Sequence, residues 1–215
     1  MTNKMITEVT IQTPKQARVY PPIKSVAVYC GSSYGNLPEY AAMATQVGQG
    51  LARLGIQLVY GGGRAGLMGQ VADAALSAGG AVVGIIPERL MNKEAAHMGL
   101  TELVVVPDMH IRKAMMMQKA DAFITLPGGV GTYEELFEVW AWLQLGYHRK
   151  PVGILNVNNY YSPLLAMMRH TVEHGFMRAE NNHQLLVDTH LDDLLAQMRV
   201  FKPMDSDAWL DKKYD

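Results

Sequence analysis

The segment 126–135 combines three glycines with two adjacent carboxylates. It reads Leu-Pro-Gly-Gly-Val-Gly-Thr-Tyr-Glu-Glu and stands between a short apolar run and a strongly apolar, helix-like stretch. Glycines at the start of a helix leave backbone N–H groups accessible, and the positive end of the helix dipole attracts an anion. Thr132 could both cap this helix and contact a phosphate. Because a carboxylate repels a phosphate, we expect Glu135 to face another part of the ligand.

A second glycine-rich turn, at residues 61–66, reads Gly-Gly-Gly-Arg-Ala-Gly. It formally matches the G-x-G-x-x-G pattern of dinucleotide sites, and Glu88 lies near the distance expected of a ribose-binding acid. That pattern normally opens the first strand–helix unit of such a fold, whereas this turn follows the second predicted strand. We therefore favour close approach of the backbone to an anion over a dinucleotide site. The chain contains no G-K-[ST] sequence, so two glycine turns without that lysine favour a monophosphate over a triphosphate.

A third turn, at residues 30–35, contains small and hydroxyl side chains, including Ser33. Its hydroxyls could donate hydrogen bonds to a phosphate or a base. A serine that caps the following helix explains the same residues equally well, and the pattern does not separate the two interpretations.

Short apolar runs that alternate with helical stretches must position these three turns. The predicted strands are 26–30, 57–60, 81–86, 102–106, 122–126, 152–156 and 185–187. The predicted helices are 37–54, 67–78, 109–120, 132–145, 161–174 and 191–200, with a less regular segment at 87–99. Near-continuous apolar strands are typical of a parallel sheet that helices cover on both faces. The sequence therefore predicts an α/β fold, a single doubly wound Rossmann-like domain with a parallel sheet of about seven strands. In such sheets ligands bind at the carboxyl ends of the strands.

The domain is predicted to span residues 23–202, between a flexible N-terminal arm at 1–22 and a polar C-terminal tail at 203–215. Hydrophobic residues make up 49% of the 215 residues and charged residues 18%, which excludes a disordered chain. The formal net charge of −1 argues against nucleic acid or a membrane surface as partner. The N-terminal segment has no apolar signal core, no window has the length of a membrane span, and a single cysteine allows no internal disulfide. We expect a cytoplasmic protein.

The sequence resembles the LONELY GUY (LOG) family, the cytokinin riboside 5′-monophosphate phosphoribohydrolases, over about residues 24–200. The similarity rests on Pro-Gly-Gly-Val-Gly-Thr-Tyr-Glu-Glu at 127–135, which matches the family's P-G-G-x-G-T-x-x-E. It extends to YGGGRAGLMG at 60–69, MHIRKAMM at 109–116 and LGYHRKPVGILNVNNYYSPLL at 145–165. The resemblance implies a Rossmann-like fold that hydrolyses an N6-modified adenosine 5′-monophosphate to free base and ribose 5-phosphate. Family members are often labelled lysine decarboxylases, but no lysine here has a convincing pyridoxal-phosphate context.

The resemblance also assigns roles to residues. Arg112 and Glu135 correspond to the family's catalytic pair, and Arg64 stands where the family often has a small or hydroxyl residue, which could alter the phosphate or base preference. The residues expected to contact substrate are Ser33, Gly62, Gly63, Glu88, Lys113, Gly128, Gly129, Val130, Gly131, Thr132, Tyr133 and Glu134.

The chemistry of ribosyl C–N cleavage suits this pair of residues. The reaction passes through an oxocarbenium-like sugar, which a carboxylate such as Glu135 stabilises while it orients or deprotonates the attacking water. An arginine is too basic to act as a general acid near neutral pH, so we expect Arg112 to hold the phosphate or ribose and to keep Glu135 ionised.

Two other functions fit the same motifs. One is a general AMP or purine nucleotide nucleosidase, and the other is a non-catalytic carrier of a nucleotide or of the molybdenum cofactor. A carrier has no need of Glu135, so the sequence favours an enzyme. The segment 170–174 matches the H-x-x-E-H pattern of some zinc proteases. We interpret it as a polar helix end and expect neither a catalytic metal nor a cofactor.

The predicted helix 132–145 is apolar on almost every side. A helix of this kind is buried all round, and part of its surface is expected to lie against another subunit. The sequence therefore predicts a homodimer or a higher homo-oligomer.

Overall fold

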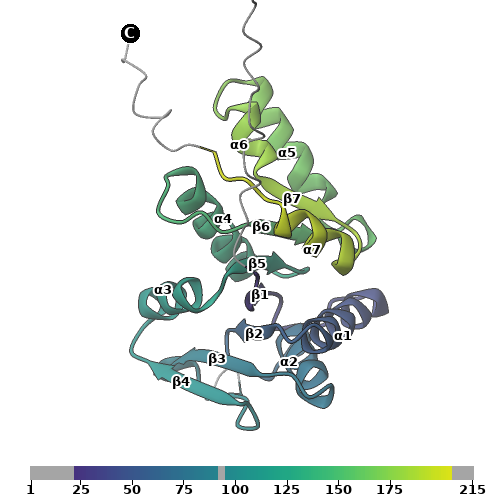
Figure 1. Ribbon diagram of the computed structural model, residues 1–215, viewed down its shortest axis with the longest axis vertical. Coiled ribbons are helices and arrows are strands. Elements are labelled where there is room, and N and C mark those ends of the chain that lie inside the picture. The colour runs from purple at the N-terminus through teal and green to yellow at the C-terminus, as the bar shows by residue number, and fades with distance from the viewer. Residues whose placement is uncertain (1–21, 92–94, 205–215) are drawn as a thin grey trace, which may run out of the picture.

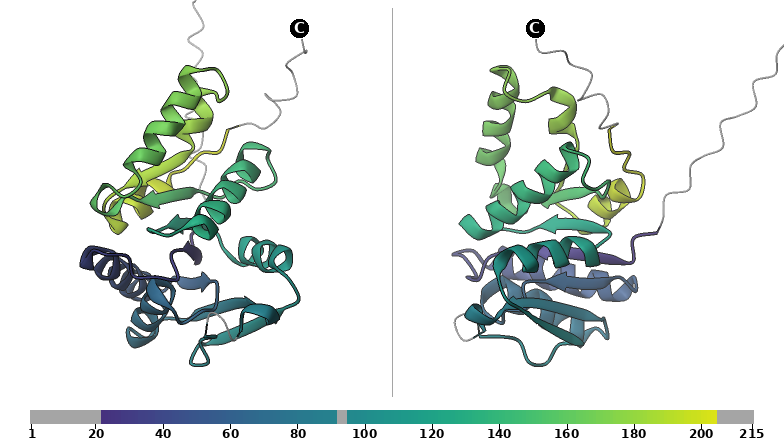
Figure 2. Two further views of the ribbon diagram at one scale, coloured as in Figure 1. Left: turned by 180° about the vertical axis from the view of Figure 1, so that it is seen from behind. Right: turned by 90° about the vertical axis from the view of Figure 1, so that its left-hand side faces the viewer.

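The computed structural model describes residues 22–91 and 95–204. Seven strands form one parallel sheet, and helices cover both of its faces (Figures 1 and 2). The strands are β1 (Ser25–Tyr29), β2 (Gln57–Tyr60), β3 (Val82–Pro87), β4 (Glu102–Val106), β5 (Ala122–Thr125), β6 (Val152–Leu155) and β7 (Leu185–Asp188). The helices are α1 (Pro38–Arg53), α2 (Gly66–Ser77), α3 (Met109–Lys119), α4 (Val130–Gln144), α5 (Ser162–Glu173), α6 (Ala179–His183) and α7 (Leu191–Arg199). The predicted α/β, doubly wound, Rossmann-like fold is confirmed.

Two apolar cores, one on each face, hold the sheet. Alternate residues of β1 point in opposite directions, so Val26 and Val28 pack with α1, α2 and α7, while Ala27 and Tyr29 pack with α3, α4 and α5. This two-sided burial explains why the strands are apolar at nearly every position.

The strand order is β4-β3-β2-β1-β5-β6-β7, so the direction of winding reverses between β1 and β5. Ligands bind at such a switch point, beyond the carboxyl ends of the strands. The chain leaves β4 at one edge of the sheet and returns through α3, which packs over β3, β2 and β1 before β5 begins (Figure 1). This long crossover carries the residues of α3 to the switch point.

Short elements that the hydrophobic pattern did not predict interrupt the regular alternation. They are the 3-10 helices η1 (Glu88–Leu90) and η2 (Val157–Asn159) and the polar five-residue helix α6. The predicted arm and tail fall outside the described residues except for Pro22, Pro203 and Met204. Within 22–91 and 95–204, no helix is long and apolar enough to cross a membrane.

The all-round apolar character of α4 is explained in part by its own domain, and the expected contact with a second subunit stays a prediction. Its residues Leu136, Val139, Trp140 and Leu143 are buried within their own domain, and Trp140 is only 2% exposed. The sequence could not distinguish a face that packs on the protein's own sheet from a face that packs on a second subunit.

Close contact between α1 and α2 yields a test of the packing. A Cβ atom on Gly48 would lie 2.8 Å from the backbone nitrogen of Ala75 and 2.9 Å from the Cβ of Ala74. We expect Gly48→Val to lower the free energy of unfolding by about 2 kcal/mol or more, because overpacked cores commonly lose 1–3 kcal/mol. Urea unfolding measures this, with Gln49→Val on the exposed face of the same helix as the matched control. Equal stability of the two variants would show that the two helices separate without strain.

Candidate active site

The three turns singled out in the sequence meet at the switch point. The backbone N–H of Gly31, after β1, donates to the Pro127 carbonyl after β5 at 3.0 Å. The N–H of Leu67, at the start of α2, donates to the Gly31 carbonyl, also at 3.0 Å. A Cβ atom on Gly31 would lie 3.2 Å from the Cα of Gly128, so the first and third turns are in direct contact.

A cavity of about 310 Å³ lies between the first and third turns. Ser33, Gly128 and Gly129 line it together with Tyr40 and Tyr160. Ser33 is exposed and Gly128 is half-buried, so both are accessible to a ligand.

The third turn leads into α4, whose first residues are predicted to bind an anion. The helix begins at Val130 with Gly129 at the N-cap position, and no side chain caps it. The expectation that Thr132 caps the helix is therefore wrong: Thr132 lies in the first turn and is buried. Its side chain packs where a Cβ atom on Gly128 would otherwise stand. The N–H groups of Val130, Gly131 and Thr132 precede the first intrahelical bonds and remain available to an acceptor.

Arg112 reaches the site from the first turn of α3. Asp108 caps this helix, because its Oδ1 accepts from the backbone N–H of Ile111 at 2.9 Å. Arg112 is only 4% exposed, and its Nη2 donates to the carbonyl of Gly61 at 3.2 Å. A Cβ atom on Gly61 would collide with this guanidinium, which is the physical reason for glycine at this position.

The charges of Arg112 and Glu135 both act on the carboxyl end of β1. Burial raises the pKa of Tyr29 well above its usual value, the negative charges of Glu135 and Glu138 raise it further, and the positive charge of Arg112 lowers it. Burial, followed by the charge of Glu135, likewise raises the pKa of the Cys30 thiol. The predicted catalytic pair therefore lies around one strand end, with Arg112 buried and Glu135 half-buried.

Lys113, the neighbour of Arg112, joins α3 to α4. Its Nζ donates to Glu134 and, at 3.0 Å, to Glu138. Desolvation alone would lower the pKa of Lys113, but the hydrogen bonds and charges of the two glutamates outweigh it and raise the pKa. Lys113 and Glu134, which the sequence placed against the substrate, thus contact each other across the two helices. Their contact with substrate stays a prediction.

The glycines of the second turn have structural partners of their own. Gly62 adopts a positive φ of 78°, and its carbonyl accepts from the N–H of His97 at 2.9 Å. Gly63 pairs with Ala96 in an isolated antiparallel bridge, and the N–H of Arg64 donates to the Ala95 carbonyl at 3.0 Å. This turn is therefore held by the segment at 95–97. Glu88 is exposed in η1, after β3.

Tyrosines that sequence reasoning missed support the third turn from behind. The hydroxyl of Tyr160 donates to the Gly128 carbonyl at 2.6 Å and lies 2.9 Å from the hydroxyl of Tyr133. The hydroxyl of Tyr161 donates to the Leu126 carbonyl at 2.7 Å. Asn158 and Asn159, which directly precede these tyrosines, have positive φ values of 47° and 60° and turn the chain here. Two asparagines before two tyrosines, directly after a buried strand, were the signal available in the sequence.

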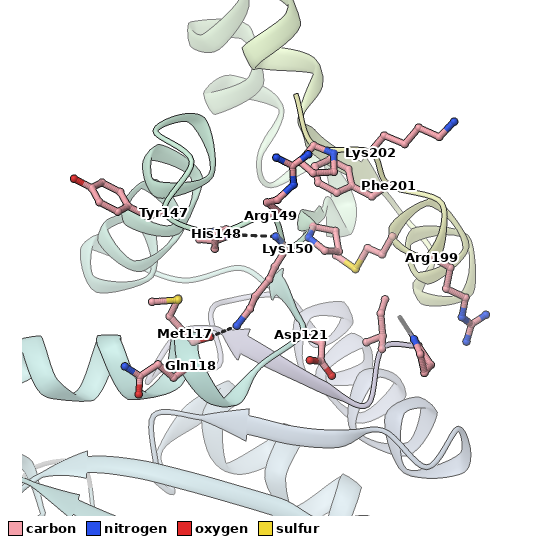
Figure 3. Close-up of a pocket in the computed structure, with 15 residues that line it drawn as sticks. Met117, Gln118, Asp121, Tyr147, His148, Arg149, Lys150, Arg199, Phe201 and Lys202 are labelled. Carbon is pink, nitrogen blue, oxygen red and sulfur yellow. Dashed lines mark hydrogen bonds between the residues drawn. The ribbon is translucent and has the colours of Figure 1, made fainter. Parts of the chain in front are cut away.

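A larger cavity, of about 960 Å³, lies at the amino ends of the strands, before β1, β5 and β6 (Figure 3). Lys150 lines this cavity and donates from Nζ to the Met117 carbonyl at 2.6 Å. None of the predicted site residues lines this cavity. Size alone therefore does not locate the site in this fold, and the switch point remains the candidate.

Comparison with known proteins agrees with the family resemblance seen in the sequence. A family model described as "Possible lysine decarboxylase" matches residues 68–198. The chain is similar to the "Cytokinin riboside 5'-monophosphate phosphoribohydrolase" of Rhodococcoides fascians, with 48% identity over 188 residues that cover 87% of this chain and 95% of that protein. It is also similar to "Cytokinin riboside 5'-monophosphate phosphoribohydrolase LOG5" of Arabidopsis thaliana, with 46% identity over 181 residues, 84% of this chain and 79% of that protein.

Among solved structures, the molybdenum cofactor binding protein of Rippkaea orientalis is similar with a TM-score of 0.62. The two share 21% identity, and the match covers 81% of this chain and 94% of that chain. At this level of identity the likeness shows a common fold and nothing about the ligand.

The hydroxyl of Tyr160 provides a test of how the third turn is held. We expect Tyr160→Phe to lower the free energy of unfolding by about 1 kcal/mol, because the Gly128 carbonyl loses its donor. Amide hydrogen exchange at residues 128–131 should become faster. Tyr147→Phe, at an exposed tyrosine, is the control and should change neither quantity. Unchanged exchange in Tyr160→Phe would mean that the turn is rigid without this bond.

Proposed function

Because the chain belongs to the LOG family of cytokinin riboside 5′-monophosphate phosphoribohydrolases, we propose that it hydrolyses the N-glycosidic bond of an N6-modified adenosine 5′-monophosphate. The products are the free base, a cytokinin, and ribose 5-phosphate. The observation that carries the proposal is 48% identity over 95% of a relative that is named for this activity. The arrangement of Arg112 and Glu135 around the carboxyl end of β1 supports it.

In the proposed reaction the C1′–N9 bond breaks and its electron pair leaves with the base. Glu135 stabilises the positive charge that develops on the ribose and takes a proton from the water whose oxygen bonds to C1′. The base gains a proton as it leaves. Glu135 suits this role because it is half-buried and its charge, like that of the buried Arg112, acts on the carboxyl end of β1.

We assign the phosphate to the third turn. Ser33 and Gly129 line the 310 Å³ cavity, and the N–H groups of Val130, Gly131 and Thr132, which directly follow Gly129, offer donors at the start of α4. The phosphate lies far from the bond that breaks, so its binding energy serves to orient the sugar. The free nucleoside should therefore be a poor substrate.

Arg112 is expected to contact the ribose or the phosphate without transferring a proton. Its bond to the Gly61 carbonyl fixes one nitrogen of the guanidinium, and the planar group keeps the others in a defined direction. The family description as a lysine decarboxylase finds no support in this geometry. A Schiff-base lysine needs a neutral amine, whereas the two glutamates on Lys113 raise its pKa and keep it charged.

The base preference separates this proposal from a general purine nucleotide nucleosidase. Incubation with isopentenyl-AMP, AMP, GMP and CMP, followed by detection of free base, distinguishes the two. Release of base from isopentenyl-AMP well above that from AMP supports the cytokinin assignment. Equal release from AMP and GMP supports the general nucleosidase, and binding without any release supports a carrier.

The carboxylate of Glu135 is the first group to test. We expect Glu135→Gln to lose at least about 100-fold in kcat while it still binds AMP, because the charge stabilises the transition state more than the ground state. Glu138→Gln, which removes a carboxylate of the same helix that contacts Lys113, is the matched control and should keep most of the rate. Near-normal turnover by Glu135→Gln would remove this residue from the mechanism.

We also propose that the protein forms a homodimer through the exposed apolar residues of α3 and α4. Met109 and Ile111 on α3 and Val130 and Phe137 on α4 are exposed, with Val130 at 82% and Phe137 at 37%. The ion pairs of Lys113 connect the two helices, and we assign their exposed apolar residues to one contact surface. Soluble monomers rarely leave such a patch uncovered.

The assembly can be tested at Phe137. We expect the wild type to sediment as a dimer and Phe137→Asp to sediment as a monomer with reduced activity, because a buried carboxylate cannot be accommodated in an apolar contact. Phe176→Asp, at a phenylalanine that is 88% exposed on the loop after α5, is the control and should remain dimeric. Ile111→Asp repeats the test on α3 if Phe137→Asp does not fold. A wild type that sediments as a monomer at micromolar concentration would contradict the proposed dimer.

A further inference from the structure

The last turn of α5 carries a cluster of metal-ligating side chains that the proposed reaction does not use. His170, Glu173 and His174 are all exposed, and their candidate ligand atoms all lie within 4.8 Å of one another. We propose that this turn binds a divalent transition-metal ion, with zinc as the occupant that its ligand set fits, at a site separate from the catalytic one.

The helix itself arranges the three side chains. Positions i, i+3 and i+4 share one face of an α-helix, so no backbone movement is needed to bring the ligands together. The imidazole rings of His170 and His174 lie with their centroids 3.9 Å apart, and Nδ1 of His170 is 3.9 Å from Oε2 of Glu173. The backbone N–H of His174 donates to the His170 carbonyl at 3.0 Å, which shows that the helical turn is closed here. Rotation of side chains alone would bring the donors to the distances of a metal site.

A second hydrogen bond fixes the tautomer of His174. Its Nδ1 lies 2.9 Å from the carbonyl oxygen of His170, and a carbonyl can only accept. Nδ1 therefore carries the hydrogen, and Nε2 keeps the lone pair that a metal requires. Metal-binding histidines in proteins are oriented by this kind of bond from the other ring nitrogen.

The donor set selects the class of ion. Two imidazoles and one carboxylate form a His₂Glu set, which zinc accepts in tetrahedral geometry with water at the fourth position. Calcium and magnesium prefer oxygen ligands and are poorly matched to two imidazole nitrogens. A single carboxylate offsets part of the ion's charge, and the exposed position lets water complete the coordination.

The position of the cluster argues against a catalytic role. Helix α5 ends at the top of Figure 1, beside α6, whereas α4 begins near β5 in the middle of the molecule. The hydrogen bonds, ion pairs and ring contacts that the structure gives these three residues stay within α5. Hydrolysis should therefore proceed equally with and without the ion.

A second cluster provides a built-in control. Asp188, His190 and Asp193 also bring their ligand atoms within 4.8 Å of one another. Both oxygens of Asp188 are already used, however, because Oδ1 accepts from the N–H groups of Thr189 and His190 and Oδ2 accepts from Gln197. Nδ1 of His190 lies 3.0 Å from the hydroxyl of Thr189. Asp188 and His190 are therefore already hydrogen-bonded to neighbouring groups, so His190 should contribute nothing to metal binding.

Calorimetric titration of zinc sulfate into the EDTA-treated and dialysed full chain tests the proposal. We expect one saturable site per chain in the wild type and in His190→Ala. The double variant His170→Ala/His174→Ala should show no saturable site, and Glu173→Gln should bind at least about tenfold more weakly, since even outer-shell partners of metal ligands contribute 10–100-fold. Circular dichroism and the rate of isopentenyl-AMP hydrolysis should be the same in all four proteins, which separates metal binding from folding and from the proposed catalysis.

Two outcomes would overturn the proposal. One is the absence of a saturable zinc site in the wild type, and the other is binding that survives in the double variant. Loss of binding in His190→Ala with retention in the double variant would place the ion at the second cluster.

Discussion

The hydrogen bond from Arg112 to the Gly61 carbonyl joins parts of the fold that no strand pairing connects. One partner lies at the start of the long crossover helix, and the other lies in the turn after β2. An arginine that is only 4% exposed needs compensating groups around its guanidinium, because an unpaired buried charge is costly. The carbonyl of Gly61 supplies one such group, and the negative charges of Glu134 and Glu135, beyond the first turn of α4, act on the same strand end as Arg112. The fold therefore concentrates charge at its switch point even though the chain is almost neutral overall.

Neighbouring residues of α3 and α4 have different interactions at the candidate site. Lys113 pairs with Glu134 and Glu138, and thereby fixes α3 against α4. The charges of the residues one step away, Arg112 and Glu135, act on the end of β1, as do those of Glu134 and Glu138. Successive residues of a helix point about 100° apart, so one pair can bind the opposite helix while the other points toward the strand ends. A change at Lys113 would consequently alter the positions of Arg112 and Glu135, whether or not Lys113 itself contacts the ligand.

Periodicity in the sequence predicted the strands and the main helices because each strand is buried on both faces and each long helix packs one face on the sheet. No local feature of the sequence indicated the order of the strands in the sheet. Arg112 and Glu135 follow consecutive strands in the chain, yet β3, β2 and β1 lie between β4 and β5 in the sheet, and only the crossover of α3 reunites them. The glycines were recognised, but a glycine that admits a ligand looks the same in sequence as one that admits protein atoms. Gly61 makes room for Arg112, and Gly66 makes room for the backbone of Ser32 and Ser33. Tyr160 was missed because its contribution is one hydroxyl on a distant carbonyl, which has no periodic signature.

Helix α4 combines a face that is buried in its own domain with apolar residues that remain exposed. Trp140 and Leu136 are buried in the core on this side of the sheet, so this face of the helix is covered by its own domain. Phe137 stacks on Trp140 with ring centroids 6.0 Å apart and still exposes part of its ring, and Val130 stands almost fully exposed at the first residue of the helix. Apolar exposure thus continues from the anchored face of α4 to the turn that is proposed to bind phosphate. A partner that covered this surface would remove water from the neighbourhood of Glu135 and strengthen the electrostatic interactions there, because charges interact more strongly where the effective dielectric constant is low. Assembly would then act on the reaction through the dielectric environment of the site, with no need for the partner to supply a reacting group.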